Sequence, residues 1–228
     1  MKHLVCACLL IVAAGMNAIA AGQTPAMRKG ISVQLAISSK ASPVPAADNA
    51  NAWILAITAE GKMYFGEDLV TPENLAAGLK VHPRDRDTKL YIKADARVSY
   101  AEVQKALKVA RESGFDAPVM LTAGITPVMA GQTVPPKGLV VMVDPPAGSD
   151  VIVLQSAVDR RAQQVRIQNQ NVQMSVLPNT LEQLAQGNAD KRVILIKASG
   201  NLTFAQVVDL IDACYAAGVK VVLAPPEK

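Results

Sequence analysis

Residues 92–114 of the chain have the sequence IKADARVSYAEVQKALKVARESG, and residues 196–218 have the sequence IKASGNLTFAQVVDLIDACYAAG. The two stretches align without a gap, and each begins with Ile-Lys-Ala, which is typical of the end of a strand. Matching chemistry at matching positions indicates a duplicated strand–helix–strand unit. The sequence therefore predicts two related domains rather than one large domain.

Each stretch also carries the signals of a helix start, a buried face and a helix end. A hydroxyl residue three positions before an acid or an amide predicts a capping box, at Ser99 with Glu102 and at Thr203 with Gln206. Apolar residues recur at helical spacing, namely Val103, Ala106, Leu107 and Ala110 in the first copy and Val207, Leu210, Ile211 and Cys214 in the second. Gly114 and Gly218 are suited to left-handed caps.

The chain starts with an apolar run over residues 4–16, followed by Ala18 and Ala20 in an A-x-A arrangement. This layout is typical of a secretory signal peptide and predicts that residues 1–20 are removed, which would release the protein into the periplasm. The alternative is an uncleaved anchor in the inner membrane, because residues 4–21 are roughly long enough for a short spanning helix.

The cysteine count argues against an internal disulfide bond. Cys6 and Cys8 belong to the leader, which leaves Cys214 alone in the rest of the chain. Cys214 lies on the apolar stripe of its expected helix and corresponds to Ala110 in the other copy. We expect it to be a buried small hydrophobic residue, with an intermolecular disulfide as the alternative.

Composition argues against several classes of function. The formal net charge of +4 is too small to indicate binding to nucleic acid or acidic lipid, and 4% aromatic residues provide few rings for stacking. Beyond the leader the only histidine is His82, in the polar stretch VHPRDRD, which favours a solvated loop over a metal or catalytic site. We expect neither an enzyme nor a cofactor or metal.

The organisation of the rest of the chain predicts an α+β fold of two tandem domains, each a small mixed β-sheet with helices packed on one face. The first domain covers residues 30–123, a linker rich in Gly, Thr and Pro covers 124–137, and a more divergent second domain covers 138–226. GLVVMV from Gly138 echoes GISVQL from Gly30 and is expected to open the second copy.

Within the second copy, the expected hairpin joins Val165–Gln168 to Val172–Val176, and the first helix is expected to begin near Asn179. Residues 149–163 find no counterpart in the first copy and look like an added segment. The linker is short, so the two copies are expected to pack against each other as an internal pseudo-dimer.

The first copy resembles the periplasmic domain of the ExbD/TolR biopolymer-transport family. The resemblance is carried by the opening strand Ile31-Ser32-Val33-Gln34-Leu35, the hairpin around Glu60-Gly61-Lys62, the signature Ile92-x-Ala94-Asp95-x-x-x-x-Tyr100, and Gly114. It implies work in a bacterial envelope, with an ExbB/TolQ-like proton-channel protein or a TonB/TolA-like component as partner, and a dimerising periplasmic domain.

The chain departs from that family in its apolar leader. The resemblance implies a transmembrane helix with an aspartate that serves proton coupling, yet no Asp or Glu precedes Asp48 here. A buried acid in a membrane is costly and persists where it has a role. We therefore expect a transport-accessory protein that is not itself proton-coupled.

Asp95 and Tyr100 are the candidate site residues. One interpretation is a contact site for a partner protein or the cell wall. The other is structural: Asp95 accepts backbone N–H bonds in the turn before the helix, and Tyr100 packs at the helix start. Ser199 and Phe204 replace them in the second copy and suit the structural interpretation.

Two hypotheses for the function remain open. The first is a cell-envelope transport-accessory protein that acts through protein–protein contacts. The second is a freestanding periplasmic binding module for peptidoglycan or another envelope ligand. Retention of the leader favours the first hypothesis, and its removal favours the second.

Overall fold

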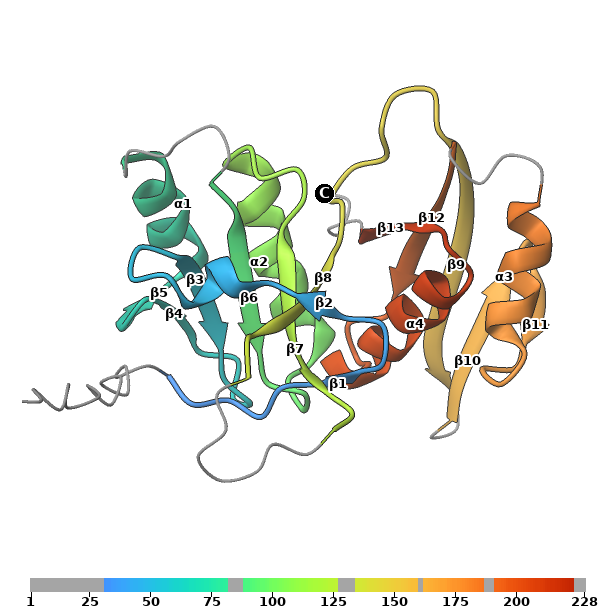
Figure 1. The fold of residues 1–228 in the computed structure, drawn as a ribbon, viewed down its shortest axis with the longest axis horizontal. Coiled ribbons are helices and arrows are strands. Elements are labelled where there is room, and N and C mark those ends of the chain that lie inside the picture. Colours follow the sequence, from blue (N-terminus) through green and yellow to red (C-terminus); the bar gives the residue numbers. More distant parts are fainter. Residues whose placement is uncertain (1–30, 82–87, 127–133, 160–161, 187–190, 224–228) are drawn as a thin grey trace, which may run out of the picture.

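The computed structural model of the chain describes residues 31–81, 88–126, 134–159, 162–186 and 191–223. Over these residues it has two mixed β-sheets and four α-helices, which confirms the predicted α+β fold (Figure 1). The leader and the loop around His82 lie outside the described residues.

The first sheet has the strand order β2-β8-β7-β6-β3-β4-β5, with β1 beside β7. Its strands are β1 (Ile37–Ser38), β2 (Ser42–Pro43), β3 (Trp53–Ile57), β4 (Met63–Phe65), β5 (Asp68–Val70), β6 (Leu90–Ala94), β7 (Val119–Gly124) and β8 (Lys137–Val140). The helices of this half are η1 (Pro45–Asp48), α1 (Pro72–Val81) and α2 (Tyr100–Glu112). β3, β6 and β7 are parallel, and α1 and α2 form the crossovers between them.

The second sheet has the strand order β11-β10-β9-β12-β13. Its elements are β9 (Asp150–Asp159), β10 (Ala162–Ile167), β11 (Gln170–Val172), α3 (Leu177–Ala185), β12 (Arg192–Ala198), α4 (Phe204–Ala216) and β13 (Lys220–Leu223). β9, β10 and β11 form an antiparallel meander, and β9, β12 and β13 are parallel. This is the order and direction of β5-β4-β3-β6-β7 in the first sheet.

The expected start of the second copy is corrected by the structure. Residues 137–140 pair antiparallel with β7 of the first sheet, so the second sheet begins at Asp150. The segment 149–163, expected to be an addition, is β9 and the start of β10, and β9 corresponds to β3. Its sequence begins as a continuous apolar run, VIVL, which a buried strand and a buried helix share.

The expected hairpin of the second copy is also shifted. The expected turn at residues 169–171 is wrong: Val165 pairs with Val172, and the turn lies at Gln168 and Asn169, which both have positive φ. The second strand ends at Val172 and does not continue to Val176. Asparagine tolerates the left-handed region better than most residues, which explains the tight turn. The following helix α3 begins at Leu177, close to the expected start near Asn179.

The helix signals of the repeat are confirmed in all but one respect. The apolar stripes of α2 and α4 are buried, and Gly114 and Gly218 have φ values of +76° and +70°. Thr203 and Gln206 form the expected capping box. The capping box at Ser99 is wrong, because its side chain makes no cap hydrogen bond and Glu102 forms an ion pair of 2.8 Å with Lys105 instead.

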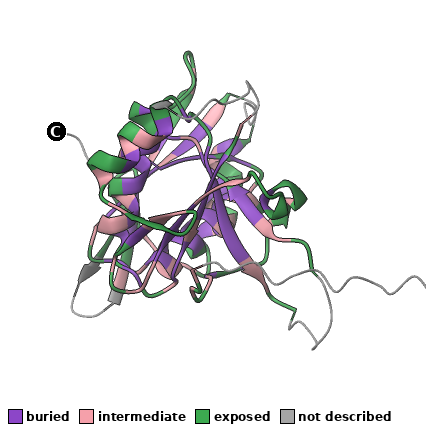
Figure 2. Cartoon of the chain, turned by 90° about the vertical axis from the view of Figure 1, so that its left-hand side faces the viewer, coloured by how far each residue is buried: buried purple, intermediate pink, exposed green. Residues whose placement is uncertain are grey.

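One hydrophobic core contains residues of both halves, on the faces of the sheets that the helices cover. Figure 2 shows the buried residues in purple on strands and helices alike. The core includes Tyr100 and Leu107 from α2 together with Phe204 and Cys214 from α4. On its other face, the first sheet has a small separate core around Tyr91 that includes Ala47 of η1. The segment with η1 therefore covers this face, and α1 and α2 pack on the opposite face of the first sheet.

Replacing Cys214 by alanine is expected to lower the free energy of unfolding by about 1 kcal/mol, through a small cavity. Cys214 is fully buried, and burial raises the pKa of its thiol to about 12. In a chain with Cys6 and Cys8 changed to serine, a thiol reagent should react after unfolding and leave the native protein untouched. Immediate reaction of the native protein would contradict the burial.

Candidate functional site

The turns that contain the two candidate residues and their counterparts meet at one place, which we name the junction: residues 94–101 and residues 198–205. Ser99 and Thr203 face each other in an antiparallel bridge. The Tyr100 N–H donates to the Leu202 carbonyl at 2.8 Å. In return, the Phe204 N–H donates to the Val98 carbonyl at 2.9 Å.

A second pair of hydrogen bonds repeats the exchange one step further out. The Ala101 N–H donates to the Gly200 carbonyl at 3.2 Å, and the Ala205 N–H donates to the Ala96 carbonyl at 2.9 Å. The first N–H groups of a helix have no partner within the helix. At the junction each helix obtains these partners from the turn that precedes the other helix, so α2 has less need of a cap from Ser99.

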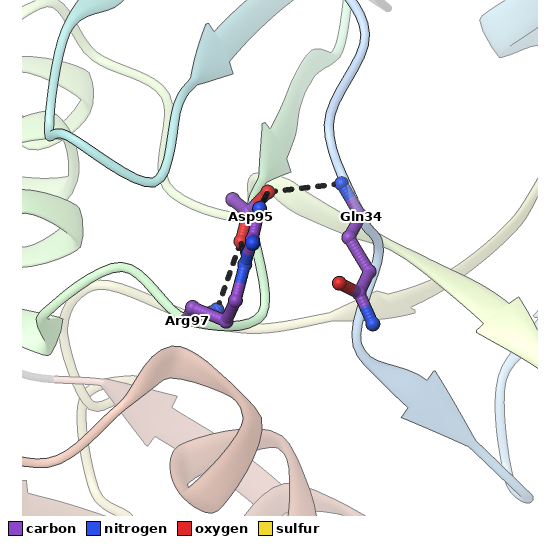
Figure 3. A network of polar contacts seen from close by, with 3 residues as sticks. All are labelled: Gln34, Asp95 and Arg97. Atoms are coloured by element: carbon purple, nitrogen blue, oxygen red, sulfur yellow. Dashed lines mark hydrogen bonds and ion pairs between the residues drawn. The ribbon is translucent and has the colours of Figure 1, made fainter.

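Asp95 lies at the edge of the junction and is 2% exposed. Its carboxylate accepts hydrogen bonds from the Gln34 N–H at 3.0 Å, from the Arg97 N–H at 3.0 Å, and from the Arg97 guanidinium at 2.9 and 3.0 Å (Figure 3). The Arg97 guanidinium and the two backbone donors hold the pKa of this carboxyl well below its usual value, against the opposing effect of burial.

The backbone of the same turn completes a connection among three segments. The Asp95 N–H donates to the Ile57 carbonyl at the end of β3, and the Ala96 N–H donates to the Gln34 carbonyl. Asp95 therefore fastens the extended segment around Gln34 to the turn before α2. This confirms that Asp95 accepts backbone N–H bonds in that turn, as the structural interpretation required.

Tyr100 is fully buried at the start of α2, as its packing role predicted. Burial raises the pKa of its phenol, and among the residues that the structure describes the hydroxyl has no hydrogen-bond partner. Contact of Asp95 or Tyr100 with a partner protein stays a prediction. It requires the partner to reach side chains that the junction and the core enclose.

Tyr100→Phe is expected to leave the protein as stable or to stabilise it by about 1 kcal/mol, because it removes a buried hydroxyl without a partner. The corresponding residue of the second half is already a phenylalanine, Phe204, and is equally buried. Chemical denaturation of the two proteins measures the difference. A loss of more than about 1 kcal/mol would show that the hydroxyl has a structural role.

The second half builds the same turn without a charged pair. The Ser199 N–H donates to the Ser156 carbonyl at 2.8 Å, as Asp95 does to Ile57, and the Asn201 N–H lies 3.4 Å from the Ser199 hydroxyl. Ser199 thus takes the place of Asp95 with a single, longer side-chain hydrogen bond. The turn tolerates this because the backbone bonds across the junction remain.

The segment after Gln34 adds a contact between the halves that the sequence did not indicate. The Ser38 hydroxyl donates to the Asp212 carboxylate of α4, and the Ser39 N–H and hydroxyl donate to the same carboxylate at 2.7 and 3.0 Å. Within the first half, the start of the same segment is held by the half-buried Lys93 ammonium, which donates to the Ile31 carbonyl at 2.9 Å. Desolvation lowers the pKa of Lys93.

Two cavities lie away from the junction. One, of about 550 Å³, is lined mainly by apolar residues of β1, β7 and the stretch before β8, among them Ile37, Ala123 and Pro136. The other, of about 370 Å³, lies at one end of the second sheet and includes the ion pair of Arg192 with Asp150 at 3.0 Å. Within the described ranges, no three His, Cys, Asp or Glu side chains gather closely enough to hold a metal ion.

The comparison with known families assigns the first half of the chain. The family model "Biopolymer transport protein ExbD/TolR" matches residues 9–124, and the chain belongs to this family. No curated protein and no solved structure matches the chain. None of the helices in the described part of the chain has the length and apolar character needed to cross a membrane.

Family membership defines the chain in broad terms. ExbD/TolR proteins are accessory proteins of biopolymer transport and are associated with the cell envelope. The resemblance seen in the strand, hairpin and signature of residues 31–114 is thereby confirmed. The matched residues stop at the end of β7, so the second half lies outside the match.

Proposed function

We propose that this protein acts through protein–protein contacts on the periplasmic side of the envelope, as an accessory subunit of a transport system that another component energises. The observation that carries the proposal is the family match, which begins at residue 9 inside the apolar run and continues through β7. A single family model thus matches both part of the apolar segment and the first domain. This favours a leader that is retained as an anchor.

The partner that fits this role is an ExbB/TolQ-like membrane protein or a TonB/TolA-like component. A chain anchored by residues 4–21 and folded from Ile31 onward holds its domain within a short distance of the membrane surface. Tethering of this kind raises the effective concentration of the domain near a membrane-embedded partner, so even weak contacts would be populated.

The alternative is a freestanding periplasmic binding module for peptidoglycan or another envelope ligand. It is favoured by Ala18 and Ala20, whose A-x-A spacing fits the recognition site of a signal peptidase. A cleaved leader would leave the protein without an anchor. The same fold would then have to find its ligand by free diffusion in the periplasm.

Mass spectrometry of the N-terminus of the native protein, combined with membrane fractionation, separates the two functions. The proposal expects residues 1–20 to be present and the protein to sediment with the membrane. A variant with Ala18→Leu and Ala20→Leu, which a signal peptidase cannot process, supplies the uncleaved reference. An N-terminus near Ala21 in a soluble fraction would overturn the proposal and support the binding module.

The contact itself is tested by crosslinking in cells. The full chain should crosslink to an ExbB/TolQ-like or TonB/TolA-like protein when anchored. A chain with the same domains behind a cleavable leader should lose that product. An equal yield from both forms would argue against a role for the anchor.

A further inference from the structure

We infer that residues 150–223 are a second ExbD/TolR-like domain, and that it docks on the first through a two-fold interface that a second copy of the chain would otherwise occupy. One chain therefore supplies a complete pair of domains and has no need of a second copy at this surface. The inference rests on the family membership of the first half and is independent of the proposed transport role.

The topology of the second half supports the assignment. Both halves contain a three-stranded antiparallel meander, a helix, a strand parallel to the first, a second helix and a third parallel strand, in the same spatial order. Such agreement over seven successive elements goes beyond the local likeness of residues 92–114 and 196–218. The family model stops before this region, where Ser199 and Phe204 stand in place of the signature residues Asp95 and Tyr100.

The hydrogen bonds at the junction are those of a two-fold interface. In such an interface residue i of one unit contacts residue j of the other, and j of the first contacts i of the second. The bonds Tyr100 to Leu202 and Phe204 to Val98 are one reciprocal pair. The bonds from Ala101 and Ala205 are another, so the backbone of the junction is self-complementary.

The junction leaves little room for a side chain at Gly200. A Cβ atom built on Gly200 would lie 3.0 Å from the Ala101 Cβ and 3.5 Å from the Ala101 Cα. The counterpart of Gly200 is Ala96, whose partner is Ala205. Small residues thus occupy all four matching positions, and this permits the two turns to pair through their backbones.

The segment that follows β8 makes further hydrogen bonds to both halves. Past β8, the Val141 N–H donates to the Pro118 carbonyl beside β7 at 3.1 Å. Its neighbour Met142 pairs with β13, donating to the Val221 carbonyl at 2.9 Å and accepting from the Leu223 N–H at 2.8 Å. Residues 137–142 therefore connect β7 to β13 within one chain, and the common core also joins the two halves.

Three substitutions of glycine test the interface, read out by the single tryptophan of the chain, Trp53. Trp53 lies in the first half, where it packs on Phe65 and Phe115, so its fluorescence reports on that half alone. Gly200→Leu, in the second half, should lower the denaturant midpoint followed by Trp53. Gly200→Ala should lower it less, because Ala101 has to yield by only a few tenths of an ångström.

Gly78→Leu is the matched control, because Gly78 lies in α1 and, apart from its own helix backbone, no atom of the described residues lies within 4 Å of an added Cβ. It should leave the Trp53 midpoint unchanged or raise it. In the unmodified full chain, light scattering should give the mass of one chain, and the transitions followed by Trp53 and by circular dichroism should coincide. A two-chain mass, or a Trp53 midpoint that Gly200→Leu leaves unmoved, would overturn the inference.

Amide hydrogen exchange on the unmodified protein gives a readout that does not depend on any variant folding. The amides of Tyr100, Ala101, Phe204 and Ala205 have their partners in the opposite half. They should be protected to a similar degree as the amides of the sheets, since they can exchange only when the halves separate. Rapid exchange at these four amides would also overturn the inference.

Discussion

Asp95→Ala is expected to lower the free energy of unfolding by about 3 kcal/mol. The substitution leaves the N–H groups of Gln34 and Arg97 without their acceptor and removes the partner of the Arg97 guanidinium. Both N–H groups lie in part-buried hydrogen bonds, and leaving a donor unsatisfied at such a site costs about 1–3 kcal/mol. The lost ion pair adds little, because the Arg97 side chain is largely exposed to water. Urea denaturation followed by circular dichroism measures the change.

Ser199→Ala is the matched control, because Ser199 holds the equivalent position in the second half with a single side-chain contact of 3.4 Å. It should cost less than about 1 kcal/mol. Equal losses at the two positions would mean that the Asp95 hydrogen bonds have no special weight. The stability of the protein would then come from the backbone pairing of the turn alone.

The contribution of Asp95 also has a defined pH dependence. The pKa of its carboxyl is lower in the folded protein than in the unfolded chain, so unfolding takes up a proton at acidic pH. Its stabilisation is complete above the unfolded pKa of about 3.9 and is lost as the pH falls below that value towards the folded pKa. The difference in stability between the unmodified protein and Asp95→Asn should therefore shrink from pH 7 to pH 3. A constant difference would contradict this.

The repeated part of the fold was predictable because its signals are local. A hydroxyl residue, an apolar stripe and a terminal glycine lie within one helix, and the structure places α2 and α4 accordingly. The error at Ser99 has a long-range cause. The Leu202 and Gly200 carbonyls, about a hundred residues away, supply the partners that local rules assign to a cap.

The parts that the sequence did not predict depend on contacts between distant segments. GLVVMV has the pattern of a strand, but nothing in it indicates whether it pairs with the sheet before or after it. The structure pairs it with β7, although the connection onward to β9 is shorter than the one from β7. Likewise Ser38 and Asp212 are ordinary surface residue types, and their hydrogen bond exists only because the first segment of the fold crosses to α4.

The signature containing Asp95 and Tyr100 identified the family, and in the structure both residues hold the turn that forms the junction. Sequence likeness between the halves predicted that they would pack together. The exchange of backbone hydrogen bonds is invisible to any side-chain pattern, and Gly200 was the residue that could have signalled it.

The chain is expected to fail at proton coupling when it is the sole ExbD/TolR-type protein in a cell. Coupling requires a titratable side chain within the membrane, shielded by partner helices. Residues 4–21 contain no acid and offer only the thiols of Cys6 and Cys8 as titratable groups. A thiol has a reference pKa of about 8.5, and burial in lipid raises it further, so the group stays protonated.

Complementation measures this directly. In cells that lack their own ExbD/TolR-type protein, the unmodified chain should give no uptake dependent on the proton-motive force. Replacing residues 4–21 by an aspartate-bearing transmembrane helix should restore uptake, and the same helix with asparagine in place of that aspartate should not. The two grafted chains differ at that residue only, so a difference between them belongs to the acid alone. Uptake with the unmodified chain would show that it couples to protons by another route.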